Sequence, residues 1–154
     1  MPKRRDAIRM SDEEIWQLIA SRQNLQVATL NKDGSVQLTT LWFAIVDGAI
    51  VFETFTKSQK IVNLKRDPRI AVLVEDGTTY DQLRGVSINA RAELVDDPAE
   101  VERYAAHIVR KNNPEVPPEM VPQAAKMMAQ KRTVVVIRPE RIASWDHRKL
   151  GGIY

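Results

Sequence analysis

Residues 54–77 read TFTKSQKIVNLKRDPRIAVLVEDG, and this stretch decides the fold because it inserts one short helix between two strands. The helix is expected to begin at Ser58. It is expected to end near Arg66, because the residue before the proline of RDP avoids helical geometry. The following run, RIAVLVED, is rich in β-branched residues and predicts a strand. A helix therefore interrupts a series of strands.

The strands around this helix are marked by Asp-Gly pairs. Upstream, the chain reads LQVATL, the turn NKDG, SVQLTTLWFAIV, the turn DG and then AIVFET. Asp-Gly between β-rich runs is a strong hairpin signal, so three consecutive antiparallel strands are expected. Downstream, LRGVSINARAELV and RTVVVIRPERIASW predict two more, the last with a break at Pro139. With RIAVLVED the count is about six.

Three helical segments accompany the strands. SDEEIWQLIASR carries a capping box in which Ser11 precedes Glu14 by three residues. DDPAEVERYAAHIVRKN has Asp97 as its cap, Pro98 at the first helical position and Glu100 completing a second capping box. A short helix is expected around VPQAAKMMAQK. The pattern predicts a mainly β protein: a single domain over residues 1–154, built as a six-stranded antiparallel barrel with peripheral helices.

Composition excludes several kinds of chemistry. The chain has no cysteine, so it has no disulfides, thiolate metal sites or cysteine nucleophiles. Its two histidines, His107 and His147, stand in unrelated contexts, and no glycine-rich phosphate loop is present. No apolar run is long enough to span a membrane and no secretory signal is visible, so a cytoplasmic protein without a membrane partner is expected. The net charge of +3 suits an anionic small molecule or nucleic acid, but no nucleic-acid reading motif occurs.

The start of the helix at Ser58 is a candidate anion site. A helix N-terminus offers unpaired backbone N–H groups and a partial positive charge, to which Ser58 adds a hydroxyl and Lys57 and Lys60 add cations. Asn63 lies one turn beyond Lys60 and is expected to face the same side. The alternative is that Ser58 is only a cap and the lysines are solvated. Spacing alone leaves both interpretations open.

Two further segments are candidates for ligand contact. In VQLTTLWFAIV the adjacent threonines Thr39 and Thr40 can present hydroxyls and backbone amides to a flat ligand, or they can pair with threonines across the sheet. The tail ASWDHRKLGGIY is unusually aromatic for a chain end and is therefore expected to dock, in a barrel groove or on a partner chain.

The order of elements resembles the split β-barrel flavoproteins of the pyridoxamine 5'-phosphate oxidase-like superfamily. The similarity runs from LQVATLNKDGSVQLTTLWF to RIASWDHRKLGG, and its most specific part is AIVFETFTKSQKIVNLKRDPRIAVLV. Within the superfamily, the chain is more similar to the flavin/deazaflavin oxidoreductases that use coenzyme F-420. The resemblance implies a homodimer with two cofactor sites at the subunit interface, and a small-molecule substrate.

The resemblance also implies roles for individual residues. Thr54, Ser58 and Lys60 match positions at the cofactor phosphate, and Lys57 and Asn63 match positions of further contacts in the deazaflavin group. The backbone of the strand from Gln37 to Trp42 would lie against the ring system, and Trp145 would approach from the partner chain, with Arg148 a weaker match. The implied cofactor-binding set is Gln37, Thr39, Thr40, Leu41, Trp42, Thr54, Lys57, Ser58, Lys60, Asn63, Trp145 and Arg148.

Departures from the oxidases shift the expected cofactor. Gln59 stands where their phosphate loop has an arginine, and Gly85 stands where their fifth strand has a cofactor-binding glutamine. The resemblance then implies hydride transfer from reduced coenzyme F-420 to a small organic acceptor. The alternatives are an FMN-dependent oxidase or reductase and a non-enzymatic flavin or heme binder. No protein acid or base is evident; Asp146, His147 and Tyr154 in the tail are the candidate proton donors.

Overall fold

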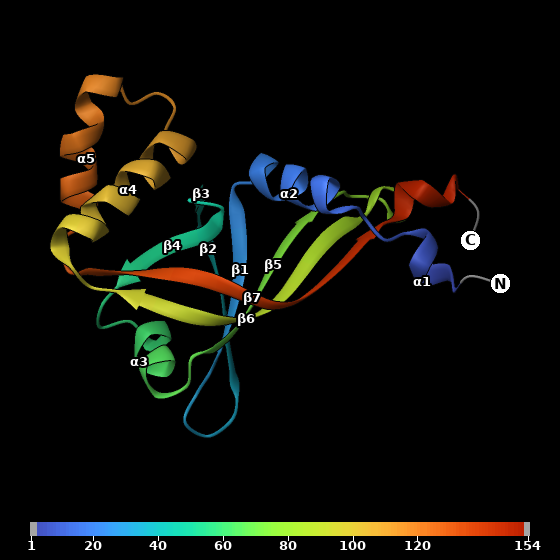
Figure 1. Ribbon diagram of the computed structural model, residues 1–154, viewed down its shortest axis with the longest axis horizontal. Helices are drawn as coiled ribbons and strands as arrows, with labels where there is room; N and C mark the ends of the chain where they lie inside the picture. Colours follow the sequence, from blue (N-terminus) through green and yellow to red (C-terminus); the bar gives the residue numbers. More distant parts are fainter. Residues whose placement is uncertain (1–2, 153–154) are drawn as a thin grey trace.

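The computed structural model describes residues 3–152 and shows a curled antiparallel sheet with helices packed around it (Figure 1). The strands are β1 (Asn24–Leu30), β2 (Val36–Trp42), β3 (Ala44–Val46), β4 (Ala49–Phe55), β5 (Arg69–Asp76), β6 (Arg84–Val95) and β7 (Arg132–Asp146). The α-helices are α1 (Arg4–Ala7), α2 (Asp12–Ser21), α3 (Gln59–Arg66), α4 (Pro98–Asn112) and α5 (Val121–Met128). No helix in this described range is long and apolar enough to cross a membrane.

The sheet has seven strands rather than the expected six, in the order β2-β1-β5-β6-β7-β4-β3. The second expected strand is divided at Phe43: β2 pairs with β1, and β3 pairs with β4. Three consecutive paired strands were the wrong prediction, since β2 has no partnership with β4 among the described residues. The two Asp-Gly hairpins themselves are confirmed.

The division at Phe43 explains why the sheet curls. β2 and β3 form the two opposite edges of the sheet, yet Phe43 alone separates them in sequence. The edges must therefore approach each other, and the sheet closes toward a barrel. The side chain of Phe43 is fully buried and belongs to the main core inside this curl, together with residues such as Leu25, Phe52 and Ile137.

Closure of the barrel is incomplete. β3 pairs only with Ala49–Val51, so the second half of β4, residues 52–55, has no strand partner on that side in the described chain. The outer edge of β2 is unpaired as well. A pocket lined by residues of both β2 and β4 lies where these free edges meet. We call the gap between β2 and residues 52–55 the barrel split.

β7 continues through Pro139, where a break was expected. The pairing of β6 with β7 shifts register between Asn89 and Ala90, and Pro139 lies opposite Ala90 at this bulge. A bulge accommodates a residue that cannot donate a ladder hydrogen bond. The strand therefore bends without ending.

The helices begin largely as the sequence predicts. Ser11 and Glu14 form the reciprocal capping box of α2, and Asp97 caps α4 by accepting from the Glu100 N–H at 3.1 Å. The second capping box was wrong in one respect, because the Glu100 carboxylate accepts from Arg103 instead. α4 and α5 pack against each other and cover the sheet near β3 and β4, over a second apolar cluster that includes Val51, Val134 and Ile108.

Candidate functional site

The first part of the site is the start of α3, directly after β4. Ser58 is the N-cap, and its hydroxyl accepts from the Ile61 N–H at 3.5 Å. The Thr54 hydroxyl, at the end of β4, donates to the Ser58 hydroxyl at 3.5 Å. The capping interpretation of Ser58 is therefore confirmed, and the structure brings Thr54 and Ser58 together at the positive end of the helix dipole.

Lys60 lies in the first turn of α3 and is buried, with only 9% of its surface exposed. Its ammonium has no hydrogen-bond or ion-pair partner within residues 3–152. Burial lowers the pKa of Lys60, because removal from water penalises the charged form. The ammonium is not one of the fully buried polar atoms that lack a partner, so it keeps contact with solvent, where a bound anion can reach it. Lys57, by contrast, is exposed.

Asn63 is fully buried and anchors α3 to the sheet. Its Nδ2 donates to Thr29 Oγ1 at 3.0 Å and to Asn31 Oδ1 at 2.9 Å, and its Oδ1 accepts from Gln59 Nε2 at 2.8 Å. Thr29 Oγ1 in turn donates to Gln37 Oε1 at 3.3 Å. These contacts employ both ends of the Asn63 amide. Asn63 therefore positions α3 against β1 and the loop that follows it, and its contact with a cofactor stays a prediction.

β2 alternates between exposed and partly buried residues. Gln37, Thr39 and Leu41 are partly buried, whereas Leu38 and Trp42 expose 68% and 41% of their surface. Threonine pairing across the sheet was a wrong alternative: Thr39 lies opposite Val27, and Thr40 lies opposite Gln26. The Thr39 hydroxyl oxygen is buried and has no partner in the described residues. β2 thus brings an unpaired strand edge to the barrel split, and its buried Thr39 hydroxyl is left unsatisfied.

A pocket of about 460 Å³ occupies the other end of the barrel split. The residues that line it are Asn24, Thr40, Leu41, Trp42, Glu53, Ile108, Met128 and Arg132. Three of the predicted cofactor residues of β2 are among them.

Sequence reasoning missed both ionisable residues of this pocket, Glu53 and Arg132. Glu53 is buried, and its Oε1 lies 3.5 Å from Arg132 Nη1, while its Oε2 has no partner in the described chain. Burial raises the pKa of Glu53 to about 7, against the opposing influence of the Arg132 charge. The available signal was a carboxylate inside the otherwise apolar β-run AIVFETF.

Trp145 and Arg148 lie far from α3 within one chain. Thr54 pairs with Thr133 at the start of β7, whereas Trp145 is twelve residues further along that strand. At about 3.3 Å per residue this corresponds to about 40 Å of strand, and Figure 1 shows the end of β7 on the opposite side from α3. Within one chain, Trp145 and Arg148 therefore lie too far from Ser58 and Lys60 to share a site with them.

Trp145 packs over Gly85, its neighbour on β6. A Cβ atom at Gly85 would lie only 2.4 Å from Trp145 Cζ2, so a side chain at this position and the indole cannot both keep their places. Gly85 is therefore required by the packing of Trp145. This gives a structural reason for the absence of the glutamine that the oxidases carry here.

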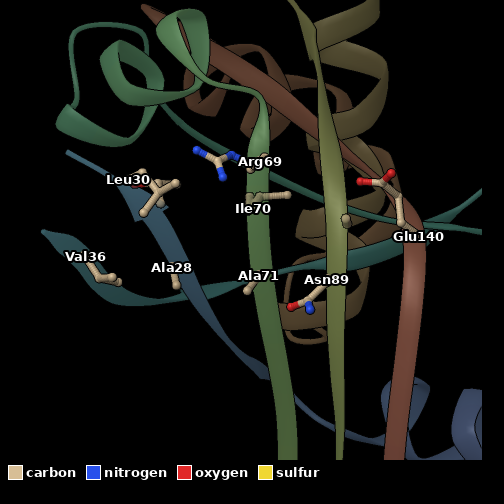
Figure 2. Close-up of a pocket in the computed structure, with 10 residues that line it drawn as sticks. Ala28, Leu30, Val36, Arg69, Ile70, Ala71, Asn89 and Glu140 are labelled. Carbon is tan, nitrogen blue, oxygen red and sulfur yellow. The ribbon is translucent and has the colours of Figure 1, made fainter. Parts of the chain in front are cut away.

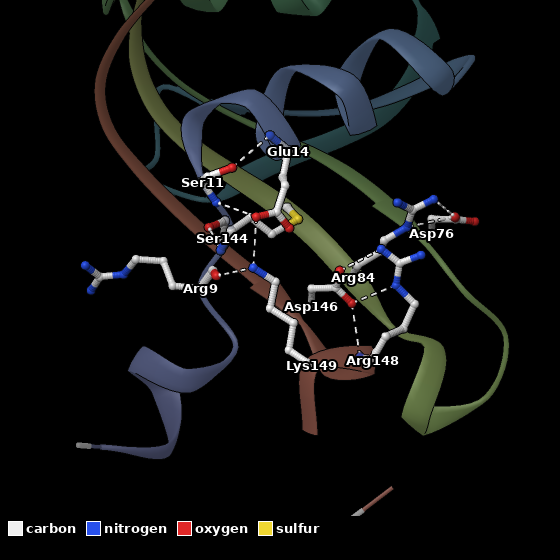
Figure 3. A network of polar contacts seen from close by, with 10 residues as sticks. Arg9, Ser11, Glu14, Asp76, Arg84, Ser144, Asp146, Arg148 and Lys149 are labelled. Atoms are coloured by element: carbon white, nitrogen blue, oxygen red, sulfur yellow. Dashed lines mark hydrogen bonds and ion pairs between the residues drawn. The ribbon is translucent and has the colours of Figure 1, made fainter. Parts of the chain in front are cut away.

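The tail docks on its own chain, as Figure 3 shows. Asp146 N–H donates to the Ile8 carbonyl at 2.7 Å, and Lys149 Nζ contacts the Arg9 carbonyl at 3.0 Å and Glu14 Oε1 at 2.9 Å. Docking is confirmed for residues 146–149, but the expected surface was wrong: the tail lies on the N-terminal segment and the loop at residues 80–83 of its own chain, not in a barrel groove or on a partner chain.

The tail contains weaker proton donors than expected. Asp146 is buried and accepts two hydrogen bonds from the Arg148 guanidinium, at 2.9 and 2.7 Å. These hydrogen bonds lower the pKa of Asp146 and favour its ionised form, which counts against a role as proton donor. His147 Nδ1 contacts the Tyr80 carbonyl at 2.8 Å, which assigns that nitrogen as a donor. Tyr154 lies outside the described residues.

The outer face of the sheet carries a shallow apolar groove of about 330 Å³ across β2, β1, β5 and β6 (Figure 2). Ala28, Leu30, Val36 and Ala71 line it, and Arg69 and Glu140 lie at its rim. Val36 and Leu38, neighbours on this face of β2, expose 59% and 68% of their surface. No group of histidine and acidic residues in the described range could hold a metal ion.

Comparisons with known proteins agree with this geometry. The family model for pyridoxamine 5'-phosphate oxidase matches residues 11–146. A conserved hypothetical protein from Mycobacterium tuberculosis is 43% identical, with a TM-score of 0.90, over 99% of this chain and 94% of its own. No curated protein gives a significant match.

Two more distant structures share the fold. An F-420 reductase is 24% identical, with a TM-score of 0.66, over 86% of this chain and 98% of its own. The heme storage protein HutZ from Vibrio cholerae is 15% identical, with a TM-score of 0.67, over 86% of this chain and 94% of its own. Proteins of this fold therefore include both an F-420 reductase and a heme storage protein.

Proposed function

Since the chain belongs to the pyridoxamine 5'-phosphate oxidase family, we propose that its barrel split binds a phosphate-bearing redox cofactor, coenzyme F-420, and that the protein is an oxidoreductase acting on a small organic acceptor. The observation that carries this proposal is Lys60, a largely buried lysine in the first turn of α3 whose ammonium has no protein partner in the described chain.

The phosphate end of the cofactor would be held by the start of α3. Lys60 supplies an ammonium, the free N–H groups of the first turn supply donors, and the Thr54 hydroxyl is positioned beside Ser58. Lys57 is close in sequence and exposed, so it adds positive charge at the entrance. Charge-assisted contacts of this kind contribute about 1.5–3 kcal/mol each. The fully hydrogen-bonded Asn63 keeps the helix in place for them.

The ring system would lie in the barrel split against the unpaired edge of β2. The free backbone groups on both edges of the split support this, and the buried Thr39 hydroxyl of the same strand is unsatisfied. Coenzyme F-420, when bound, supplies the hydride chemistry. The protein's own contribution is to hold a flat ligand between β2 and β4 and to exclude water with the apolar side chains of Leu41, Ile108 and Met128.

The assembly we propose is a homodimer with both sites at the interface. The apolar groove of Figure 2, with Val36 and Leu38 exposed beside it, is a surface that a second copy would cover. Trp145 and Arg148 cannot reach α3 in the same chain, so in a dimer they would approach the site of the partner. The test of this part is the mass of the protein in solution, by light scattering.

FMN is the second candidate cofactor, and the family match itself favours it. Against FMN stands Gln59, in place of the arginine of the oxidases: its amide donates to Asn63 Oδ1 at 2.8 Å, so it adds no charge to the phosphate site. A dianionic phosphate would then be met by fewer cations than in the oxidases. This is the reason for preferring the deazaflavin.

Parallel titrations with F-420, FMN and heme test the proposal, with the absorption spectrum of each bound form recorded. Saturable F-420 binding at least about tenfold tighter than binding of FMN or heme is expected, given the difference of one charge-assisted contact. Tighter FMN binding with an ordinary flavin spectrum would identify FMN as the cofactor and leave the proposed oxidoreductase class unchanged. Tight heme binding without affinity for either flavin-type molecule would refute the proposed function.

A further inference from the structure

The pocket at the Trp42 end of the barrel split contains a buried acceptor with no donor. The Glu53 side chain is 4% exposed, and its Oε2 has no hydrogen-bond partner in the described residues. Buried polar atoms in folded proteins are almost always paired, so an unpaired one that lines a pocket indicates the place of a ligand donor. Glu53 lines the 460 Å³ pocket and lies on the half of β4 that has a free edge.

Arg132 places a donor beside this acceptor. Its Nη1 lies 3.5 Å from Glu53 Oε1, too far for a strong hydrogen bond, and its guanidinium lies over the Phe55 ring at 4.3 Å. Stacking on Phe55 restrains the guanidinium without occupying all of its N–H groups. The pocket therefore presents an acceptor and a donor side by side from neighbouring strands.

The rest of the pocket is suited to a flat apolar body. Trp42 exposes 41% of its surface, and Leu41, Ile108 and Met128 supply apolar contacts from β2, α4 and α5. Among the described residues that line it, Glu53 and Arg132 are the only ionisable ones. The pocket thus combines apolar walls with one adjacent acceptor–donor pair.

We propose that Glu53 and Arg132 recognise the polar edge of a planar heterocycle in the barrel split, with Glu53 Oε2 accepting from a ring N–H and the Arg132 guanidinium donating to the adjacent ring carbonyl. The matching ligand chemistry is a –CO–NH–CO– edge on an aromatic ring system. This inference deepens the proposed function and rests on it for the identity of the ligand, because deazaflavins and flavins both carry such an edge. It requires no contact with Lys60.

A ligand N–H at this place would also stabilise the ionised form of Glu53. Burial raises the pKa of Glu53 to about 7, and a hydrogen bond donated to the ionised form would favour that form. A ligand N–H therefore compensates both the unpaired oxygen and the unfavourable charge, whereas a ligand acceptor at the same place would compensate the protonated form only.

Lumichrome is the appropriate probe, because it has the imide edge and the flat ring but neither phosphate nor side chain. Its binding is followed by fluorescence quenching at neutral pH, with N3-methyl-lumichrome as the matched ligand whose edge is blocked. Wild-type protein is expected to bind lumichrome about tenfold or more tightly than the methylated form, as a hydrogen bond to a charged group predicts. Glu53→Met is expected to abolish this preference. The exposed Glu93→Met is expected to retain it.

Equal affinity of wild-type protein for the two ligands, or no lumichrome binding, would overturn the inference without requiring any variant to fold. A preference that survives in folded Glu53→Met protein would overturn it as well. These results are separable from failure of the proposed function. If F-420 affinity depends on Lys60 but lumichrome and its methylated form bind equally, only the role of Glu53 and Arg132 is refuted. If lumichrome is preferred but F-420 affinity does not depend on Lys60, only the phosphate assignment is refuted.

Discussion

Replacement of Glu53 by glutamine is expected to stabilise the ligand-free protein at alkaline pH and to have little such benefit in acid. Glutamine preserves the shape of the side chain but cannot ionise. In the wild-type protein, burial raises the pKa of Glu53 from an ordinary 4.5 to about 7, despite the nearby Arg132. The folded protein therefore binds this proton more tightly than the unfolded chain does.

The sign and size of the effect follow from that difference. Stability associated with the protonated carboxyl is fully present below pH 4.5, declines as pH rises, and is lost above about pH 7. The interval between 4.5 and about 7 corresponds to about 3.4 kcal/mol at about 1.36 kcal/mol per pH unit. Between pH 5 and pH 8 the wild-type protein should lose about 2.5 kcal/mol relative to Glu53→Gln.

Urea unfolding of both proteins without ligand, at pH 5 and at pH 8, measures this directly. The stability advantage of Glu53→Gln should grow between the two pH values by an amount of that order. Glu93→Gln is the control, because Glu93 forms an exposed ion pair with Arg138 and its loss should change stability by less than about 1 kcal/mol. An advantage that is the same at both pH values would show that Glu53 is not a desolvated carboxyl.

Two further substitutions test the end of β7. Gly85→Ala should destabilise the protein by about 1–3 kcal/mol through overpacking against Trp145. This cost should largely disappear when Trp145 is replaced by leucine. An equal cost with and without Trp145, measured by thermal unfolding, would exclude the contact. Asp146→Asn should cost about 1.5–3 kcal/mol at neutral pH by weakening the contact with Arg148. Because the pKa of Asp146 is lowered, this contribution is present above pH 3.8 and lost as pH falls below it; denaturant unfolding that shows no cost at neutral pH would contradict this role.

Local signals predicted the elements of the fold better than their pairing. Asp-Gly turns and capping residues fixed both hairpins and the starts of α2, α3 and α4, because these features depend on neighbours in sequence. The division at Phe43 is different: the run SVQLTTLWFAIV has β character throughout, and only closure of the sheet directs its two halves to opposite edges. Pro139 illustrates the converse, because a bulge in the paired strands removes the local break.

In the candidate site, too, local sequence features were predicted and features set by tertiary structure were not. Ser58 and Lys60 were visible from a helix N-terminus and from the family resemblance, and the structure adds that Lys60 is buried and unpaired within the described chain. Asn63 could not be assigned from spacing, since its partners Thr29 and Asn31 belong to β1 and the loop after it. Glu53 was missed for the same reason: its importance lies in burial at the barrel split, which depends on tertiary structure.

The affinity of Lys60→Met protein for coenzyme F-420 tests the central claim most directly. Calorimetric titration should show binding weakened by about tenfold or more relative to wild type, because one charge-assisted phosphate contact is removed. The exposed Lys126→Met, on α5, should bind as wild type does. Equal F-420 affinity in wild-type and Lys60→Met protein would contradict the account, since Lys60 would then lie outside the phosphate site.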